Sequence, residues 1–431
     1  MADLFEDLEL RGLVHQVSDP DLARALSGEP LTAYVGFDPT ADSLHVGHLL
    51  QVCLVRRLAR AGHRTLVVVG GATGLIGDPG GKAEERALLA EECVVENAAA
   101  VRRQLETLVD LDGEWGASSG RTLLLDNISW LSSLTAVGFL RDVGKHFSVN
   151  QMIAKESVRE RLLRPERGIS FTELSYMLLQ AYDFLHLFDT YGCRLQVGAS
   201  DQWGNITMGI DLIRKLRGER AWGMTTPLVL KADGVKFGKT EHGTVWLDRN
   251  RTSPYQLYQF FLRSDDSVVG KYLRYFTSLS LEEIEELDTA CASRPERREA
   301  QRALARSVCT LVHGKGETDA AERAAAALFS GELAGLDEVT LLDVLSDAPS
   351  ARIGREQVVT SKLGILDALV QAGLARSRSD ARRTLLQGGV YVNNRRQEDP
   401  ERFLGPADLI HDRYVVLRKG KKEQCLVQVG D

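Results

Sequence analysis

The 431-residue sequence lacks the features that mark secreted, membrane-spanning or metal-scaffolded proteins. No apolar run approaches the roughly 20 residues needed to cross a bilayer. Met1–Leu10 carries acids instead of the basic and apolar stretches of a secretory signal. Six cysteines are scattered without a close pair, which offers neither a disulfide framework nor a four-ligand zinc site. We therefore expect a cytoplasmic protein, kept in a reducing compartment, without structural zinc.

Two common nucleotide-binding patterns are also missing. The glycine-rich stretch Gly70–Gly81 does not fit a phosphate loop, because Ile76 stands where the first glycine is needed and Lys82 is followed by Ala83. The stretch also lacks the G-x-G-x-x-G pattern of dinucleotide-binding folds.

Charge is unevenly distributed along the chain. The net charge is −7, yet residues 376–422 contain 12 Lys and Arg against 6 Asp and Glu, so the remaining residues sum to −13. A basic module at the end of an acidic body is typical of a protein with a phosphate-rich partner. On charge alone, a solvated charged face remains an equal alternative.

The first half of the sequence predicts an α/β fold. Thr32–Phe37 and Thr65–Val69 are rich in β-branched residues and predict buried strands, and His45–Ala61 between them has helical apolar spacing. Further strands are predicted at Thr122–Leu125, Arg194–Val197 and Met224–Leu230. This alternation predicts a parallel sheet covered by helices on both faces.

The second half predicts two further domains. Helical patterns cover Tyr255–Leu262, Leu281–Cys291 and Arg297–Leu328, and residues 331–362 have little periodicity. We expect a catalytic domain at 1–230, a loop and connection at 231–252, an α-helical domain at 253–330, a linker at 331–362 and a small α+β unit at 363–431.

Residues 34–48 carry the first group of chemically informative side chains. The chain leaves the predicted strand through an Asp-Pro-Thr turn and enters a helix whose first turn is expected to hold His45 and His48. Histidines three apart share a helix face. Gly47 lets a ring or phosphate approach the backbone, and a helix N-terminus favours an anion. Metal ligation or ordinary surface histidines remain alternatives at this point.

The second group lies at Lys231–Thr240. An Asp-Gly turn precedes Lys236 and Lys239, so the loop can place two ammonium groups on a triphosphate. Cations aimed at a departing pyrophosphate would lower the barrier to its release. Taken alone, a lysine-rich loop is more often a solvated surface.

Together these stretches resemble the motifs of a known family. HVGH at 45–48 and KFGKT at 236–240 are similar to the HIGH and KMSKS motifs of class I aminoacyl-tRNA synthetases. With residues 34–48, Ser175–Asp183 and Ser200–Asn205, the chain resembles bacterial tyrosyl-tRNA synthetases over nearly its whole length.

The resemblance implies a Rossmann-like catalytic domain, a helical anticodon-stem domain and an S4-type RNA-binding domain in a homodimer. It implies L-tyrosine, ATP with Mg²⁺ and tRNA(Tyr) as ligands, with no organic cofactor, no membrane and no protein-held metal. Tyr34 and Asp183 would bind the substrate phenol, Asp78, Tyr176 and Gln180 its ammonium group, and Gln202 would lie near its carboxylate. Read singly, each of these residues has an equal chance of a structural role.

For ATP, the resemblance assigns one set of residues to the nucleotide and another to the departing pyrophosphate. Asp38, Thr40, His45, Gly47 and His48 would bind the nucleotide and its α-phosphate, and Gly198 and Asp201 would line the adenosine side. Lys82, Arg86, Lys236, Lys239 and Thr240 would meet the pyrophosphate, with His45, His48, Lys236, Lys239 and Thr240 as the catalytic set. The KFGKT motif departs from KMSKS, and its Gly238 is expected to loosen the loop.

The basic C-terminal unit supports an RNA step. Ser379 is the expected N-cap of a short helix, and the candidate RNA-binding residues are Arg378, Arg382, Arg383, Arg395 and Arg396. Two alternatives remain: a tryptophan-activating enzyme of the same architecture, and an RNA-binding protein that has lost catalysis. Tyr34 with Asp183 favours a phenol, and the intact HVGH and lysines favour an active enzyme.

Overall fold

The computed structural model describes residues 3–79, 88–109, 111, 121–155, 158–159, 162, 168–235, 237–240, 243–330, 333–345, 348–360, 362–420 and 423–430. The chain forms two compact units. Unit 1 comprises Met1–Thr252 and Leu262–Val312, and unit 2 comprises Ser253–Phe261 and His313–Asp431. Each unit is described by itself.

Unit 1 is built on a six-stranded sheet in the order β1-β6-β5-β2-β3-β4. Its strands are β1 (Gln16–Val17), β2 (Thr32–Phe37), β3 (Arg64–Val69), β4 (Thr122–Asp126), β5 (Cys193–Ala199) and β6 (Trp222–Thr226). Strands β2 to β6 are parallel, and the short β1 runs antiparallel to β6. The predicted parallel sheet is therefore confirmed. The last predicted strand ends at Thr226 and not at Leu230, because Pro227 cannot donate a ladder hydrogen bond.

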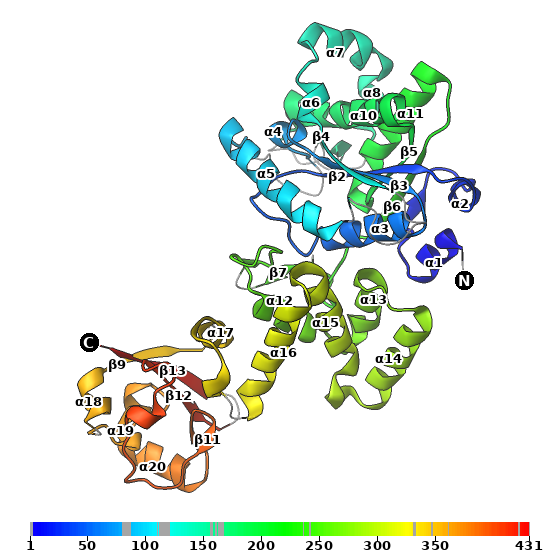
Figure 1. The fold of residues 1–431 in the computed structure, drawn as a ribbon. Coiled ribbons are helices and arrows are strands. Elements are labelled where there is room, and N and C mark those ends of the chain that lie inside the picture. The colour runs from blue at the N-terminus through cyan, green and yellow to red at the C-terminus, as the bar shows by residue number, and fades with distance from the viewer. Residues whose placement is uncertain are drawn as a thin grey trace. The chain divides into compact units, whose positions relative to one another are not determined.

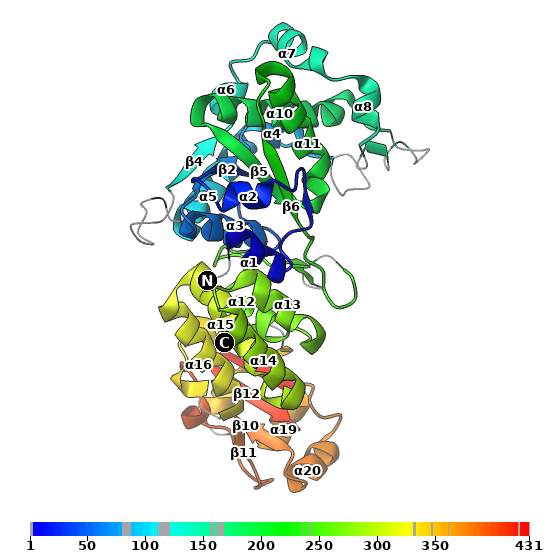
Figure 2. The same ribbon diagram turned by 90° about the vertical axis from the view of Figure 1, so that its right-hand side faces the viewer.

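Strand order reverses beside β2. The chain proceeds from β2 outward to β3 and β4, then returns to place β5 on the other side of β2. Figure 2 shows β2 and β5 between β4 and β6. Such a reversal opens a crevice beyond the carboxyl ends of the two central strands, where ligands of open α/β sheets bind. The loops that follow β2 and β5 therefore occupy the position expected for a binding site.

Helices cover both faces of the sheet. The helices α3 (Leu49–Arg60) and α5 (Glu91–Leu108) lie on one side of the sheet, and α10 (Phe171–Tyr191) and α11 (Trp203–Arg217) lie on the other (Figure 1). Ser170 caps α10 by accepting a hydrogen bond from the Glu173 amide, and Gly192 ends the helix with a φ of 66°. The short helices α4 (Thr73–Ile76), α6 (Ile128–Leu131), α7 (Ala136–Asp142) and α8 (Val149–Ile153) lie in the connections. Helices α10 and α11 pack on each other and on β5.

The helical part of the chain contains a break that the sequence did not predict. The range Arg297–Leu328 was expected to form one helix, but α15 (Glu299–His313) and α16 (Lys315–Ser330) are separated by Gly314. Gly314 has a φ of 84°, a conformation incompatible with a continuing right-handed helix. The other helices here are α12 (Pro254–Leu262), α13 (Asp266–Phe276) and α14 (Leu281–Ser293).

Unit 2 contains a second sheet, in the order β11-β10-β12-β13-β9. Its strands are β9 (Ser350–Gly354), β10 (Val390–Val392), β11 (Arg395–Arg396), β12 (Tyr414–Lys419) and β13 (Glu423–Gly430). The helices α18 (Arg355–Val359), α19 (Ile365–Gln371) and α20 (Arg378–Leu386) contribute to this unit, and side chains of α19 and α20 form a core with the strands. The range 331–362, expected as a linker, contains α17 (Glu338–Val344) and β9, which pairs with β13 in parallel.

Two helix starts differ from their predicted positions. Helix α3 begins at Leu49 with His48 at its N-cap, so His45 precedes the helix instead of lying in its first turn. Helix α20 is capped by Ser377 and not Ser379, because the Ser377 side chain accepts from the Asp380 amide. A helix long and apolar enough to cross a membrane is not found in the described part of the chain.

Candidate active site

The HVGH motif lies at the switch point, between β2 and α3. The rings of His45 and His48 stack with centroids 3.9 Å apart and an interplanar angle of 19°. Each ring accepts a backbone hydrogen bond at Nδ1: His45 from the Gly47 amide at 3.0 Å and His48 from the His45 amide at 3.2 Å. In a neutral imidazole whose Nδ1 accepts, the proton is on Nε2. Both rings can therefore donate from Nε2 to an anion.

Gly47 is needed for this arrangement. A Cβ added at this position would lie 2.7 Å from Cε1 of His45, a distance that real Cβ atoms essentially never show. The spacing of the motif is therefore a steric requirement, since the glycine between the two histidines leaves room for the first ring to fold back.

The second motif packs against the first. Gly238 has a φ of 86°, and a Cβ there would lie 2.5 Å from Cγ2 of Val46. The Gly238 carbonyl accepts from the Val245 amide at 2.9 Å, and the Val245 carbonyl accepts from the Val46 amide at 3.1 Å. Phe237 is buried against Tyr272, with ring centroids 4.8 Å apart. In this loop conformation, the glycine permits both the positive φ and the close packing of the two motifs.

Of the two lysines of the second motif, only Lys239 lies among the described residues. Lys236 lies outside the described residues, as do Lys82 and Arg86. Lys239 and Thr240 form the short strand β7 (Lys239–Thr240), which pairs antiparallel with β8 (Gly243–Thr244). The contacts of these five residues with a nucleotide therefore stay a prediction.

A buried carboxylate marks the interior of the site. Asp183 on α10 is 1% exposed, and both of its oxygens accept hydrogen bonds. Asn127 Nδ2 donates to Oδ2 at 3.0 Å, and Trp130 Nε1 donates to Oδ1 at 2.7 Å. Trp130 in turn stacks on His186, with centroids 4.6 Å apart. Asn127 and Trp130 come from the turn that follows β4 and from α6, so two segments combine to hold one carboxylate.

A polar chain connects this carboxylate to the loop after β2. Asn127 Nδ2 also donates to the Thr73 hydroxyl at 3.0 Å, and that hydroxyl donates to Asp38 Oδ1 at 2.7 Å. The second Asp38 oxygen accepts from the Tyr176 hydroxyl at 2.7 Å. Asp38 was predicted on the nucleotide side and Tyr176 on the amino-acid side, and the structure brings the two into direct contact.

A second cluster joins α10 to the loop after β5. Asn205 Nδ2 donates to Gln180 Oε1 at 2.9 Å and to Gln202 Oε1 at 3.2 Å. Gln202 Nε2 donates to the Asp78 carboxylate. The predicted residues Gln180, Gln202 and Asp78 are thus brought together, and Asn205, which the sequence did not single out, connects them.

Burial dominates the protonation of the interior groups. It raises the pKa of Asp183 to about 7, with the nearby Asp38 and Asp126 raising it further, whereas the hydrogen bonds from Asn127 and Trp130 oppose the shift. Burial first, and then the negative charge of Asp183, raise the pKa of Tyr34 well above its usual range. Tyr34 is therefore a neutral hydroxyl at any physiological pH, beside a carboxyl that titrates near neutrality.

The remaining predicted residues lie on the loops around these clusters. Asp201 lies in a 3₁₀ turn, Ser200–Gln202, directly after β5. A Cβ on Gly198 would lie 2.9 Å from Cβ of Gln202, so glycine is needed where the strand meets this turn. Thr40 is exposed in the loop after β2, where its amide donates to the Asp38 carbonyl at 2.9 Å.

Sequence reasoning missed three residues that hold the site together, Thr73, Asn127 and Trp130. The only signal in the sequence is position, since Asn127 follows a predicted strand at the edge where ligands bind. Their partners are 35, 56 and 53 residues away along the chain. No local pattern connects residues at such separations.

The arginines expected to bind RNA lie on unit 2. Arg378, Arg382 and Arg383 are on α20, and Arg395 and Arg396 form β11. Four form ion pairs within the unit: Arg378 with Asp367, Arg382 with Glu401, Arg383 with Asp380, and Arg396 with Glu398. Arg382 and Arg383 keep more than half of their side-chain surface exposed, so their ion pairs are weak in water.

The described residues contain no cluster of three or more His, Cys, Asp and Glu that could hold a metal ion. The arrangement instead offers imidazole donors, backbone amides and a buried carboxylate. Such a site can bind the polar end of an organic molecule at the carboxylate and an anionic group at the imidazole and amide donors. The two bound groups would then be positioned for a group-transfer reaction.

Comparisons with known proteins agree with this geometry. The family described as tRNA synthetases class I (W and Y) matches residues 26–330, and the C-terminal domain of tyrosine–tRNA ligases (SYY-like) matches residues 341–427. A tyrosine–tRNA ligase of Roseiflexus castenholzii is 51% identical over 429 residues, covering 100% of both chains. One of Geobacillus stearothermophilus is 49% identical, covering 99% of both chains.

Among solved structures, a C-terminally truncated mitochondrial tyrosyl-tRNA synthetase of Aspergillus nidulans superposes with a TM-score of 0.68 at 34% identity. It covers 76% of this chain and 95% of its own. The two family matches together span most of the chain, and the relatives are about half identical over nearly its full length. Both findings indicate the same family. The chain belongs to the class I tRNA synthetases of the tryptophan and tyrosine type, and within them to the tyrosine–tRNA ligases.

Proposed function

We propose that the chain activates L-tyrosine with ATP and then transfers the tyrosyl group to the 3′ end of tRNA(Tyr). The observation that supports tyrosine most directly is the buried Asp183, held by Asn127 and Trp130. With the neutral Tyr34 hydroxyl, it forms a polar end suited to a phenol. A substrate without the hydroxyl would leave buried polar groups unpaired, which is costly. The two aromatic amino acids that lack a phenol are thereby disfavoured.

The first step is an attack by the tyrosine carboxylate on the α-phosphorus of ATP. A new bond forms between a carboxylate oxygen and this phosphorus, the bond to the β-phosphate bridging oxygen breaks, and pyrophosphate leaves with the electron pair. The carboxylate is already a nucleophile, so no general base is required. The Nε2 protons of His45 and His48 are suited to stabilise charge that develops on the phosphate oxygens.

The remaining predicted residues take roles around these groups. Asp78, Tyr176 and Gln180 hold the tyrosine ammonium group, Gln202 lies near its carboxylate, and Asp38, Thr40, Gly47, Gly198 and Asp201 hold the nucleotide. Lys82, Arg86, Lys236, Lys239 and Thr240 meet the pyrophosphate. Magnesium arrives with ATP as part of the substrate.

In the second step the terminal ribose hydroxyl of tRNA attacks the activated carbonyl, and AMP leaves. Residues 1–230 with the loop 231–252 carry the chemistry, and 253–330 form the anticodon-stem domain. The C-terminal unit, expected at 363–431 and extended by β9 from the 331–362 range, forms an S4-type RNA-binding domain. Its basic residues and the phosphates of the tRNA attract each other. We place the protein in the cytoplasm, where tRNA is charged.

We also propose a homodimer. Large apolar side chains are exposed within residues 127–171, with Val137 75% and Phe171 73% exposed. Leu140 and Val149 add to this exposed apolar surface. A second copy of the chain would cover it. Sedimentation equilibrium at micromolar concentration should return twice the mass of one chain, and a monomer would contradict the proposal.

Tyrosine binding should depend on pH through Asp183. Its pKa is about 7, so the carboxyl is mostly protonated at pH 6, and a phenol that donates to the carboxylate must first displace that proton. We expect the Kd for tyrosine to be about tenfold higher at pH 6 than well above pH 7. Calorimetry in buffers of different ionisation enthalpy should show nearly one proton released at pH 6 and almost none at pH 8.5. Binding without proton release at either pH would contradict this role.

His48→Ala should slow adenylate formation far more than it weakens tyrosine binding. Loss of one donor to developing charge typically costs about 10²–10³ in rate. We expect a drop of that size in stopped-flow adenylation, with the Kd for tyrosine within about twofold of wild type. His15→Ala removes an exposed histidine and is the matched control. An equal loss of rate and tyrosine affinity in His48→Ala would contradict this division.

Arg383→Gln combined with Arg395→Gln should weaken tRNA binding without affecting activation. We expect the KM for tRNA to rise about tenfold at moderate salt, since two phosphate contacts are lost. Tyrosine-dependent pyrophosphate exchange should remain at the wild-type rate. Arg352→Gln with Arg355→Gln removes the same charge from exposed positions of the same unit and is the control. Identical KM values for both double variants would show that the effect is not specific to the proposed surface.

A further inference from the structure

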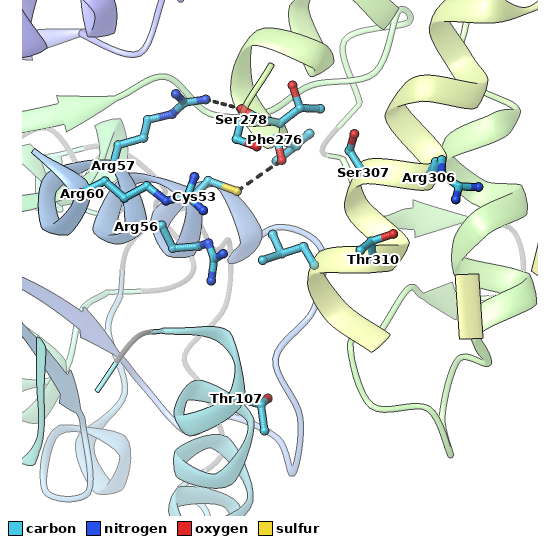
Figure 3. Close-up of a pocket in the computed structure, with 12 residues that line it drawn as sticks. Cys53, Arg56, Arg57, Arg60, Thr107, Phe276, Ser278, Arg306, Ser307 and Thr310 are labelled. Atoms are coloured by element: carbon cyan, nitrogen blue, oxygen red, sulfur yellow. Dashed lines mark hydrogen bonds between the residues drawn. The ribbon is translucent and has the colours of Figure 1, made fainter. Parts of the chain in front are cut away.

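A cavity lined by arginines lies in unit 1, away from the candidate active site. Its volume is about 590 Å³, within the range of small-molecule sites. Arg56, Arg57 and Arg60 of α3 line one side, and Arg306 of α15 lines another. Figure 3 shows the three arginines of α3 across from the residues contributed by α15. Four arginines from two helices thus line one cavity.

The other lining groups are suited to the same kind of ligand. The cavity is also lined by the hydroxyl-bearing residues Ser278, Ser307 and Thr310. Guanidinium and hydroxyl groups donate hydrogen bonds, and guanidinium matches the geometry of phosphate oxygens. No Asp or Glu lines the cavity among the described residues. The lining is therefore complementary to an anion with several oxygen acceptors.

Arg57 is a largely buried cation whose hydrogen bonds are only partly satisfied. Its guanidinium donates to the backbone carbonyls of Thr277 and Arg274, and its Nε is buried without a hydrogen-bond partner in the described part of the chain. Asp7 is 3.7 Å away. Burial and the neighbouring Arg11 lower the pKa of Arg57 to about 10. An anion beside this group would add to the attraction that Asp7 already supplies.

Two of these arginines also interact favourably with the dipole of helix α3. Arg57 and Arg60 lie in its last turn, where cations interact favourably with the helix dipole. Arg306 belongs to a different helix, α15, and brings a further arginine to the same cavity.

The cavity is separate from the nucleotide site. His48 caps the N-terminus of α3, and Arg56 follows eight residues later, about 12 Å along the helix axis at 1.5 Å per residue. The same helix therefore presents its N-terminus to the candidate active site and its C-terminal half to the arginine-lined cavity.

We propose that the cavity formed by Arg56, Arg57, Arg60 and Arg306 is a second anion site that binds phosphate groups of a ligand other than the ATP being consumed. The phosphates belong either to a free polyphosphate compound or to the backbone of the bound tRNA. The second source depends on the proposed tRNA-charging activity, and the first does not.

The test uses the full-length protein saturated with tyrosine and a non-hydrolysable ATP analogue, so that the active site is unavailable to the probe. Tripolyphosphate is titrated calorimetrically into the wild type and into Arg60→Gln combined with Arg306→Gln. Both side chains are exposed, so the fold should survive, and thermal unfolding verifies this. Arg102→Gln with Arg103→Gln removes the same charge from exposed positions of α5 and is the control.

We expect the Arg60/Arg306 variant to bind tripolyphosphate at least about tenfold more weakly than wild type, as for lost charged hydrogen bonds, and the control to change less than twofold. A parallel measurement of the KM for tRNA identifies the source. An unchanged KM with weakened tripolyphosphate binding assigns the site to a free phosphate compound. A KM raised about tenfold in the Arg60/Arg306 variant alone assigns it to the tRNA backbone.

The proposal is overturned if neither tripolyphosphate affinity nor the KM for tRNA distinguishes the Arg60/Arg306 variant from the control. Pyrophosphate exchange with tyrosine should be equal in all three proteins. Loss of exchange in the wild type would instead contradict the proposed function, so the two failures are distinguishable.

Discussion

A carboxylate buried in the core of the catalytic unit is the constraint on which the site depends. Asp183 is 1% exposed, and an isolated buried charge of this kind is strongly unfavourable. Asn127 and Trp130 offset part of that cost by donating to its two oxygens. The hydrogen bonds to Asp183 therefore hold the turn after β4 and helix α6 against α10. Thr73 connects Asn127 in turn to Asp38, in the loop after β2. The side chains proposed to bind the substrate are held in place by the same hydrogen bonds that satisfy this buried carboxylate.

Among its described residues, the proposed nucleotide side contains no buried charge of this kind and depends instead on close approach of the backbone of its two motifs. Gly47 leaves room for the ring of His45, and Gly238 brings the second motif against Val46. In the arrangement seen here, a Cβ at either position would clash with the neighbouring motif residue. Stacking of the two histidines orients their Nε2 protons, and catalysis by such a site rests on positioning and electrostatic stabilisation.

The sequence predicted what depends on local pattern. Strands β2 and β3 match their β-branched runs, and β4 and β5 lie at the further predicted strands. Helix α3 follows its apolar spacing, because burial of one face imposes this period. The start of α3 was misplaced, since its N-cap depends on how His48 packs on His45. The division at Gly314 was missed because a glycine is tolerated within a helical pattern, and the sequence does not show that this one has a positive φ. The hydrogen-bond partners of Asp183 could not be predicted from the sequence, because they lie more than 50 residues away along the chain and only the fold brings them together.

The most direct test of the account is ATP–pyrophosphate exchange without tRNA, measured with tyrosine, phenylalanine and tryptophan in turn. The buried pair of Asp183 and Tyr34 predicts exchange with tyrosine and none above background with the other two, because each would leave the buried polar groups unpaired. Exchange supported equally by phenylalanine or tryptophan would contradict the claim that this carboxylate and hydroxyl select a phenol.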